Sequence, residues 1–177
     1  MKIIVIRHAK TVYNENGIIN GQQDDNLSPE GLLELPGLVE KLNGYNFTAL
    51  YSSPLQRAVE TAKPIAKNKN LDLIIDPRLI EVNFGSFTSK NWDSMKSVFG
   101  MKSTALLDSY NYDLRPYGGE SSEEVRKRIE DFLNYLKEQG GQPVVVSHAG
   151  IIRWFYYLCI GQKISSPPNA SVHLLDF

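Results

Sequence analysis

The chain has 177 residues, of which 42% are hydrophobic, so it is long enough for one domain with a substantial core and short for two. Its formal net charge is −1 and its basic residues are scattered, which excludes the concentrated positive charge that nucleic acids and anionic membrane surfaces attract. We therefore expect a single domain, residues 1–177, with no nucleic-acid partner and no membrane partner.

Neither the N-terminal segment nor the most apolar run of the sequence predicts a membrane-spanning segment. The N-terminus runs directly into a strand-like segment and lacks the features of a signal peptide, which predicts a cytoplasmic protein. The most apolar run, residues 151–160, is too short to span a bilayer and contains Arg153, so it predicts a buried helix. The single cysteine, Cys159, cannot form an internal disulfide and is expected to be a small core residue.

The first predicted strand ends on two polar residues. Residues 3–6 are consecutive apolar residues, a pattern typical of a strand buried on both faces, and Arg7 and His8 follow at once. In open α/β sheets, ligands bind beyond the carboxyl ends of the strands. This segment alone therefore predicts either a catalytic pair or a strand-edge arginine beside a structural histidine.

A loop and a helix follow this strand. Residues 9–26 are polar and contain several glycines, which predicts a long loop over the site. Ser28 and Pro29 indicate a helix start, with Ser28 as the N-cap and Pro29 at the first helical position. Pro36 and Gly37 interrupt the helical pattern, so we expect a kink or a restart there.

A second short strand is predicted over residues 47–51, again followed by a helix start. Ser53 and Pro54 repeat the earlier pattern, and Gln56 is placed to complete a capping box with Ser53. Arg57 falls in the first turn of this helix. A second arginine is thus placed close to the carboxyl end of a strand.

A third strand is predicted over residues 71–75, and Glu81 follows it. Residues 86–118 then lose regular periodicity, which predicts an insertion with short helices, folded over the site as a lid. Its aromatic and basic residues suggest a substrate that is partly apolar and that carries an anionic group in addition to the group bound at the strand ends. The basic residues are Lys90, Lys96, Lys102 and Arg115.

The next helix has clear start and stop signals. Ser121 and Glu124 form a capping box, and Gly140 ends the helix. Residues 143–146 predict a fourth buried strand, which delivers His148 just as the first strand delivers its histidine.

Strands that alternate with helices, ending in a strand over residues 171–175, predict an α/β fold. We expect a three-layer α/β/α sandwich with a mostly parallel central sheet and a helical insertion over the active site. Because the carboxyl ends of parallel strands face the same way, the polar residues that follow them should converge. Guanidinium groups match phosphate oxygens, and a neutral imidazole can attack phosphorus. The converging residues are Arg7, His8, Arg57, Glu81 and His148.

The same residues fall in motifs that resemble those of the histidine phosphatase superfamily, whose best-known members are the cofactor-dependent phosphoglycerate mutases. The motifs occur in family order and extend over nearly the whole chain, which is far more specific than one Arg-His pair. They are Arg7-His8-Ala9-Lys10-Thr11 with Asn14, Asn20-Gly21-Gln22, Leu27-Ser28-Pro29-Glu30-Gly31, Ser52-Ser53-Pro54-Leu55-Gln56-Arg57-Ala58, Glu81 with Phe84-Gly85, Gly118-Gly119-Glu120-Ser121, and Val146-Ser147-His148-Ala149-Gly150.

The resemblance implies a role for each matching residue. His8 would accept the phosphoryl group, and Glu81 would act as the general acid and then as the base for water. Arg7, Arg57 and His148 would bind the phosphoryl oxygens and stabilise developing charge. Further phosphate or substrate contacts would come from Thr11, Asn14, Gly21, Gln22 and the backbone amide of Ala149. The length and the Gly-Gly-Glu-Ser motif look most like the broad-specificity and α-ribazole phosphatase branch.

The chain also departs from the family pattern. Ala9 replaces the signature glycine, where a Cβ disfavours positive φ and could crowd the phosphate. Lys10 replaces a residue that is commonly acidic or polar. Residues 86–89 lack the acidic residue and the glycine that usually follow at this edge of the site.

We expect a histidine-type phosphatase, a hydrolase that acts on a small-molecule phosphomonoester through a phosphohistidine, with no cofactor and no metal. A mutase is disfavoured because it normally carries a longer insertion and a C-terminal tail. A non-catalytic binder that kept the arginine clamp is a second alternative. A metallohydrolase that uses His8, His148 and Glu81 as ligands is the third, disfavoured by the absence of a metal-binding motif and by the two arginines. No feature of the sequence predicts an oligomeric state.

Overall fold

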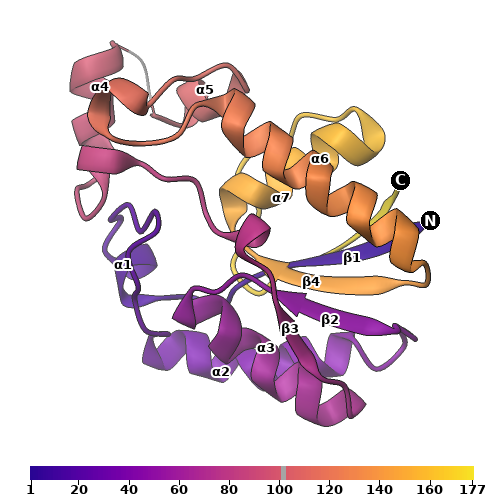
Figure 1. Ribbon diagram of the computed structural model, residues 1–177. Coiled ribbons are helices and arrows are strands. Elements are labelled where there is room, and N and C mark those ends of the chain that lie inside the picture. The colour runs from indigo at the N-terminus through magenta and orange to yellow at the C-terminus, as the bar shows by residue number, and fades with distance from the viewer. Residues whose placement is uncertain (101–102) are drawn as a thin grey trace.

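The computed structural model describes residues 1–100 and 103–177 and is built around one five-stranded sheet (Figure 1). The strand order is β3-β2-β4-β1-β5. All neighbouring strands are parallel except β5, which runs antiparallel to β1. The mostly parallel α/β fold expected from the sequence is therefore confirmed. The strands are β1 (Lys2–Arg7), β2 (Ala49–Ser52), β3 (Leu73–Ile75), β4 (Pro143–Ser147) and β5 (Val172–Asp176).

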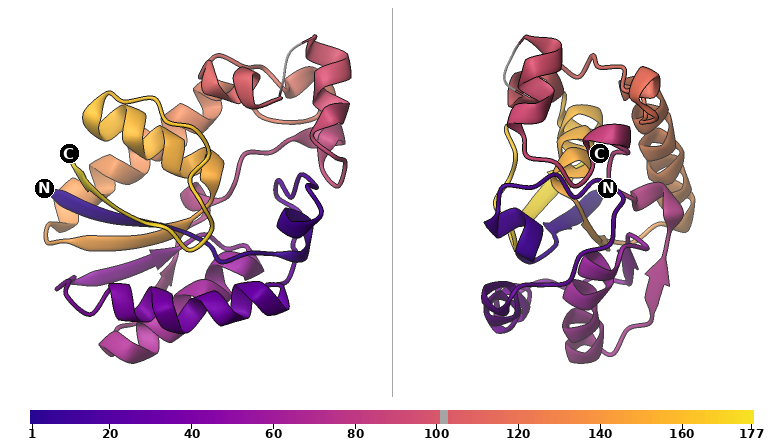
Figure 2. Two further views of the ribbon diagram at one scale, coloured as in Figure 1. Left: turned by 180° about the vertical axis from the view of Figure 1, so that it is seen from behind. Right: turned by 90° about the vertical axis from the view of Figure 1, so that its left-hand side faces the viewer.

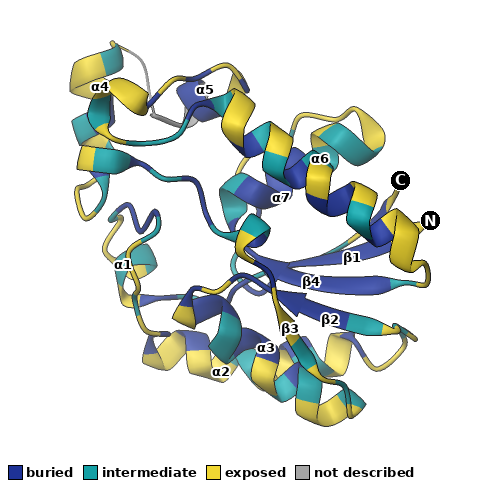
Figure 3. Cartoon of the chain, in the orientation of Figure 1, coloured by how far each residue is buried: buried dark blue, intermediate teal, exposed yellow. Residues whose placement is uncertain are grey.

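Helices cover both faces of the sheet, as Figures 1 and 2 show. On one face lie α2 (Pro29–Lys41) and α3 (Gln56–Lys69), and on the other lie α6 (Ser122–Gln139) and α7 (Ala149–Ile160). The strand β4 is buried throughout and β1 is buried over residues 3–6, whereas the helices expose their outer sides (Figure 3). This arrangement is the three-layer sandwich that alternating strands and helices predict.

The core is divided by the sheet into two hydrophobic clusters. Ile3 and Val5 of β1 point into the cluster on the α6 and α7 side, and Ile4 and Ile6 point into the cluster on the α2 and α3 side. This alternation follows from the two-residue period of a strand. Because both faces are buried, β1 needs apolar residues at every position, and its register holds Arg7 and His8 at the carboxyl edge.

The segment over residues 86–118 lies above this edge of the sheet (Figures 1 and 2). It contains α4 (Asp93–Phe99), α5 (Ser103–Asp108) and the 3₁₀ helix η3 (Arg115–Tyr117), and the 3₁₀ helix η2 (Gly85–Phe87) leads into it. The rings of Phe87, Phe99 and Tyr117 pack against one another with centroids 5.0–5.8 Å apart. Aromatic contacts of this kind give the segment a small core of its own.

Several element boundaries differ from the expected ones. β2 begins at Ala49 and β3 at Leu73, each two residues later than expected, because strand pairing starts only there. The helix α2 runs through Pro36 and Gly37 without a restart. Both residues are exposed, so water can satisfy the carbonyl group that Pro36 leaves without a partner.

The expected capping box of α3 does not form. Leu55 is the N-cap and makes no side-chain cap hydrogen bond. The Ser53 hydroxyl instead accepts the N–H of Leu55 at 3.3 Å and contacts the His148 ring at 2.7 Å. By contrast, the capping box of Ser121 and Glu124 at the start of α6 is present as expected.

The apolar run near the C-terminus forms α7, whose first half is buried as expected. Cys159, on its second half, is partly buried and packs against the core cluster. Within residues 1–100 and 103–177, no helix is both long enough and apolar enough to cross a membrane.

Candidate active site

A cavity of about 500 Å³ opens at the carboxyl ends of the parallel strands. Most of the predicted site residues line it, although they come from distant parts of the chain. His148 is not among the lining residues, but its ring centroid lies 5.1 Å from that of His8. The predicted residues that line the cavity are Arg7, His8, Asn14, Gly21, Arg57, Glu81 and Ala149.

His8 is buried directly after β1. Its Nδ1 lies 2.7 Å from the carbonyl oxygen of Ala9, and because a carbonyl oxygen only accepts, Nδ1 carries the hydrogen. Burial and the nearby charges of Arg57 and Arg7 lower the pKa of His8 well below its usual value. The ring is therefore neutral near pH 7 and presents the Nε2 lone pair, which is the form that a nucleophile needs.

The backbone after His8 accommodates the unusual Ala9. Ala9 is fully buried, has no positive φ, and donates its N–H to the Thr61 hydroxyl at 3.0 Å. The departure from the signature glycine thus causes no backbone strain.

Two guanidinium groups lie near the histidine: that of Arg57 is fully buried and that of Arg7 is partly buried. Arg57 donates to the carbonyl oxygens of Gly21 at 2.7 Å and Gln23 at 2.8 Å, and Arg7 donates to that of Pro167 at 2.5 Å. Burial lowers the pKa of Arg57 to about 10, so the group stays charged at neutral pH. The Nε atoms of both arginines are buried without a hydrogen-bond partner, so each group keeps a donor for an anion.

Glu81 places a carboxyl group at the same cavity. Its oxygens accept the N–H groups of Val82 at 2.9 Å and Gly150 at 3.3 Å. Burial raises the pKa of Glu81 above its usual value, although these hydrogen bonds and the charges of Arg57 and Arg7 oppose the rise. A carboxyl group with a raised pKa holds a proton closer to neutral pH, as a general acid must.

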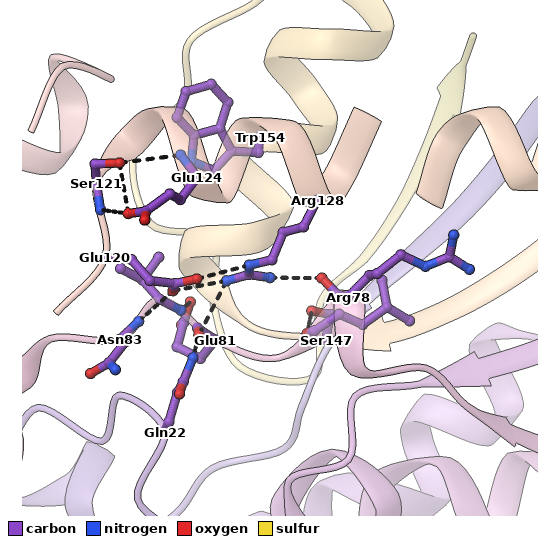
Figure 4. A network of polar contacts seen from close by, with 12 residues as sticks. Gln22, Arg78, Glu81, Asn83, Glu120, Ser121, Glu124, Arg128, Ser147 and Trp154 are labelled. Atoms are coloured by element: carbon purple, nitrogen blue, oxygen red, sulfur yellow. Dashed lines mark hydrogen bonds and ion pairs between the residues drawn. The ribbon is translucent and has the colours of Figure 1, made fainter. Parts of the chain in front are cut away.

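A polar network holds the backbone of Glu81 in place (Figure 4). The Glu81 carbonyl oxygen accepts hydrogen bonds from Gln22 at 2.9 Å and Arg128 at 3.3 Å. Arg128 of α6 also forms an ion pair with Glu120 at 3.2 Å, and Glu120 accepts the N–H of Asn83 at 2.7 Å. Sequence reasoning missed Arg128 as a site residue, because on the helix it is one of several charged positions.

His148 follows β4 and is fully buried. Its Nε2 lies 2.7 Å from the Ser53 hydroxyl, while its Nδ1 is buried without a partner. Burial, the charge of Arg57 and the neighbouring His8 lower its pKa well below the usual value, so the ring is neutral near pH 7. A Ser53 hydroxyl that donates to Nε2 leaves Nδ1–H as a donor beside His8.

Some of the residues expected to contact the substrate do not line the cavity. Thr11 caps α1 (Val12–Glu15) and forms a capping box with Asn14, and neither Thr11 nor Gln22 is among the cavity-lining residues. Their role as substrate contacts stays a prediction. Asn169, which the sequence analysis did not single out, lines the cavity and donates to the His8 carbonyl oxygen and the Asn14 side chain, both at 3.0 Å.

The basic residues expected to reach the substrate from the segment 86–118 lie elsewhere. Of those that the structure describes, Lys90, Lys96 and Arg115 are not at the cavity, and Arg115 forms an exposed ion pair with Asp113. Lys102 lies outside the described residues. Besides Arg7 and Arg57, the arginine that lines the cavity in the described part of the chain is Arg153 of α7.

Metal-ligating side chains do not cluster in the described part of the chain. Among residues 1–100 and 103–177, no three His, Cys, Asp or Glu side chains are grouped as a metal ion would need. The arrangement of two cations around a neutral imidazole instead suits an anionic substrate.

The fold and the site together define a phosphoglycerate mutase-like α/β enzyme with a histidine flanked by arginines. Residues 3–177 match the model of the histidine phosphatase superfamily (branch 1), and the chain belongs to this family. The family resemblance expected from the sequence is thereby confirmed, and relatives named as phosphatases support the phosphatase class that the sequence predicts.

Proteins similar to this chain include both phosphatases and a mutase. The chain is 33% identical to the metal-independent phosphoserine phosphatase of Arabidopsis thaliana, over 98% of this chain and 75% of the relative. It is 28% identical to the adenosylcobalamin/alpha-ribazole phosphatase of Escherichia coli K12, over 98% of this chain and 84% of the relative. A crystal structure of phosphoglycerate mutase from Bacillus anthracis superposes with a TM-score of 0.87 at 27% identity and covers 98% of this chain and 86% of that chain.

Proposed function

We propose that the protein hydrolyses small-molecule phosphomonoesters through a phosphohistidine formed at His8. One observation carries the proposal: the contact of Nδ1 with the Ala9 carbonyl oxygen leaves Nε2 of a buried, neutral imidazole unprotonated between two guanidinium groups. A ring held in this tautomer needs no separate base before it attacks phosphorus.

The proposed reaction has two steps. In the first, His8 Nε2 forms a bond to phosphorus, the ester P–O bond breaks, and the leaving oxygen takes the proton of Glu81. In the second, water attacks phosphorus, gives its proton to the Glu81 carboxylate and displaces Nε2, which releases phosphate and restores the enzyme. Arg7, Arg57 and the Nδ1–H of His148 bind the phosphoryl oxygens in both steps.

The test is to trap the phosphoenzyme. Alkaline quenching of the protein during turnover of a radiolabelled phosphomonoester should leave a labelled, acid-labile adduct. His8→Ala should lose both the adduct and turnover while its unfolding curve stays cooperative. His173→Gln is a matched control, because His173 lies on β5 with its ring bonded to Tyr156 and Ser171, away from the cavity. A variant of His8 that kept turnover would disprove the proposed nucleophile.

The same experiment separates the alternatives. A non-catalytic binder would give no adduct and no phosphate release. The second candidate is a mutase-type enzyme, because the fold is similar to a phosphoglycerate mutase structure. Such an enzyme would form the adduct but transfer its phosphoryl group to an added alcohol rather than to water. Measuring free phosphate against transferred phosphate distinguishes hydrolysis from transfer.

We also propose that residues 1–177 act as one phosphoglycerate mutase-like domain in which the segment 86–118 serves as a lid. Trp92, Leu107 and Asp108 of this segment line the cavity, which supports the proposal. Binding of vanadate, a phosphate analogue, should change the fluorescence of Trp92 in a Trp154→Phe variant. A cytoplasmic location stays a prediction.

A further inference from the structure

Arg153 places a further buried cation at the cavity. Its side chain is 6% exposed, it lines the cavity from α7, and one of its terminal nitrogens donates to Asp108 of α5. Its Nε is buried without a hydrogen-bond partner. Among the residues that the structure describes, the other buried side-chain atoms in this condition belong to Arg7, Arg57 and His148.

Arg153 thus shares an unpartnered buried nitrogen with Arg7, Arg57 and His148, the residues proposed to bind the phosphoryl group and called the clamp below. A buried guanidinium is costly unless both its charge and its N–H donors are satisfied. Asp108 supplies only part of the compensation, because its side chain is 45% exposed and water screens the pair. The Tyr110 ring, with its centroid 5.4 Å from the guanidinium carbon, supplies a further weak contact. Arg153 therefore retains capacity for an anion.

We propose that Arg153 and Asp108 form a second subsite that binds the carboxylate and the ammonium group of a phosphorylated amino acid. The proposal rests on the proposed phosphatase function and names the substrate class of the same cavity. Arginine pairs bidentately with a carboxylate, and an aspartate accepts hydrogen bonds from an ammonium group.

The charges of Arg153 and Asp108 favour a ligand that carries both a carboxylate and an ammonium group over one that carries a carboxylate alone. Arg153 and Asp108 together carry no net charge, so an added carboxylate alone would leave the subsite with an excess negative charge. A zwitterion places its carboxylate at Arg153 and its ammonium at Asp108, and the subsite stays neutral. This preserves the compensation that a partly buried ion pair requires.

The subsite can be tested with four alkyl phosphates that vary these two groups. L-phosphoserine carries both groups, 3-phosphoglycerate carries the carboxylate with a hydroxyl in place of the ammonium group, O-phosphoethanolamine carries the ammonium group, and ethyl phosphate carries neither. Because all four have alkoxide leaving groups, differences in kcat/KM report the subsite rather than the demand for a general acid.

Each substitution should affect a different pair of substrates. Arg153→Gln should lower kcat/KM about 10-fold or more for the two carboxylate esters and much less for the other two. Asp108→Asn should lower it for the two ammonium esters and spare 3-phosphoglycerate. Arg153→Lys should recover only part of the loss, because an ammonium group lacks the guanidinium fork. Arg115→Gln, which breaks an exposed ion pair on the same segment, should leave all four substrates unchanged.

Equal losses on all four substrates would show that Arg153 has only a structural role and would overturn the subsite. A binding measurement makes this outcome independent of turnover. L-phosphoserine should bind the His8→Ala protein, measured by calorimetry, and adding Arg153→Gln should weaken that binding about 10-fold or more. Unchanged binding would overturn the subsite alone, whereas absence of turnover of any ester by the unmodified protein would overturn the proposed function.

Discussion

The side chain of Glu81 lies directly against the backbone of Gly150. Its Oε2 accepts the Gly150 N–H at 3.3 Å, and a Cβ on Gly150 would lie 2.5 Å from Oε1. Gly150 is in the first turn of α7, so the start of this helix positions the carboxyl group. The contact explains why a glycine follows the motif that ends in His148 and Ala149, although its φ is ordinary.

Gly150→Ala should therefore displace the carboxyl group and lower kcat on an alkyl phosphate by about 10-fold or more. Alanine favours the helix by up to about 1 kcal/mol, but the added Cβ would also lie 2.9 Å from Val82 Cγ2, so we expect no net gain in stability. Gly37→Ala is the matched control, because a Cβ there meets nothing within 4 Å on the exposed side of α2. Steady-state kinetics and urea unfolding of both variants test this, and full activity of Gly150→Ala would contradict the positioning of Glu81.

Arg57→Lys should lower kcat/KM at least about 10-fold, which is about 1.4 kcal/mol of transition-state stabilisation. The arginine uses two terminal nitrogens on the Gly21 and Gln23 carbonyl oxygens and has an Nε donor without a partner, whereas a lysine offers one point charge. Arg126→Lys, on the exposed side of α6, should have no effect. Near-normal kinetics of Arg57→Lys would remove this residue from the clamp.

Local sequence patterns predicted the residues that strands deliver. His8 and His148 directly follow the apolar strands β1 and β4, and the parallel pairing of these strands brings the two rings together. The capping box at Ser121 was also predictable, because it depends on residues three positions apart. Strands and helix caps can therefore be predicted from sequence, because they depend on residues that are close together in the chain.

Contacts between distant segments were not predictable in this way. Ser53 fits a capping box by local pattern, yet its hydroxyl contacts His148, 95 residues further along the chain. Arg153 was noted only as a charge in an apolar run, and its pairing with Asp108 depends on how the segment 86–118 folds back over α7. Tertiary contacts override local preferences at such positions.

Arg128→Met should impair the positioning of Glu81 rather than binding of the phosphoryl group. Arg128 donates to the carbonyl oxygens of Glu81 and Arg78, so its loss loosens the segment that carries the carboxyl group. We expect kcat on an alkyl phosphate to fall about 10-fold with KM little changed, and Arg128→Lys to recover part of it. Equal falls in kcat on alkyl and aryl phosphates, together with a loss of stability in urea unfolding, would argue for a purely structural role.

Glu81 should also set a pH dependence of stability. Burial raises its pKa in the folded protein, so the folded state binds the proton more tightly than the unfolded state. The stability that this contributes is complete below the usual pKa of glutamate and is lost as the pH rises through the raised value. Glu81→Gln should thus gain stability relative to the unmodified protein at about pH 7 but not at about pH 4, measured by urea unfolding.

Glu124→Gln is the control of opposite sign. Hydrogen bonds from Ser121 lower the pKa of Glu124, so its contribution is present above the usual glutamate range and is lost as the pH falls. This variant should be less stable than the unmodified protein near neutral pH, and the difference should shrink in acid. The same sign for both variants would contradict the raised pKa of Glu81.

The role of Glu81 as the general acid predicts a dependence on the leaving group. An alkoxide needs a proton as it departs, whereas p-nitrophenolate is a stabilised anion that leaves with little help. Glu81→Gln keeps the shape of the side chain but cannot give up a proton, so it should lose far more activity on an alkyl phosphate than on p-nitrophenyl phosphate. The pH profile should change in parallel: activity of the unmodified protein on the alkyl ester should fall as the pH rises through the raised pKa of Glu81, and this limb should disappear in the variant. Equal losses on both esters would instead assign Glu81 to substrate binding or to the activation of water. The proton donor would then be sought in the segment 86–118, because its Asp108 also lines the cavity.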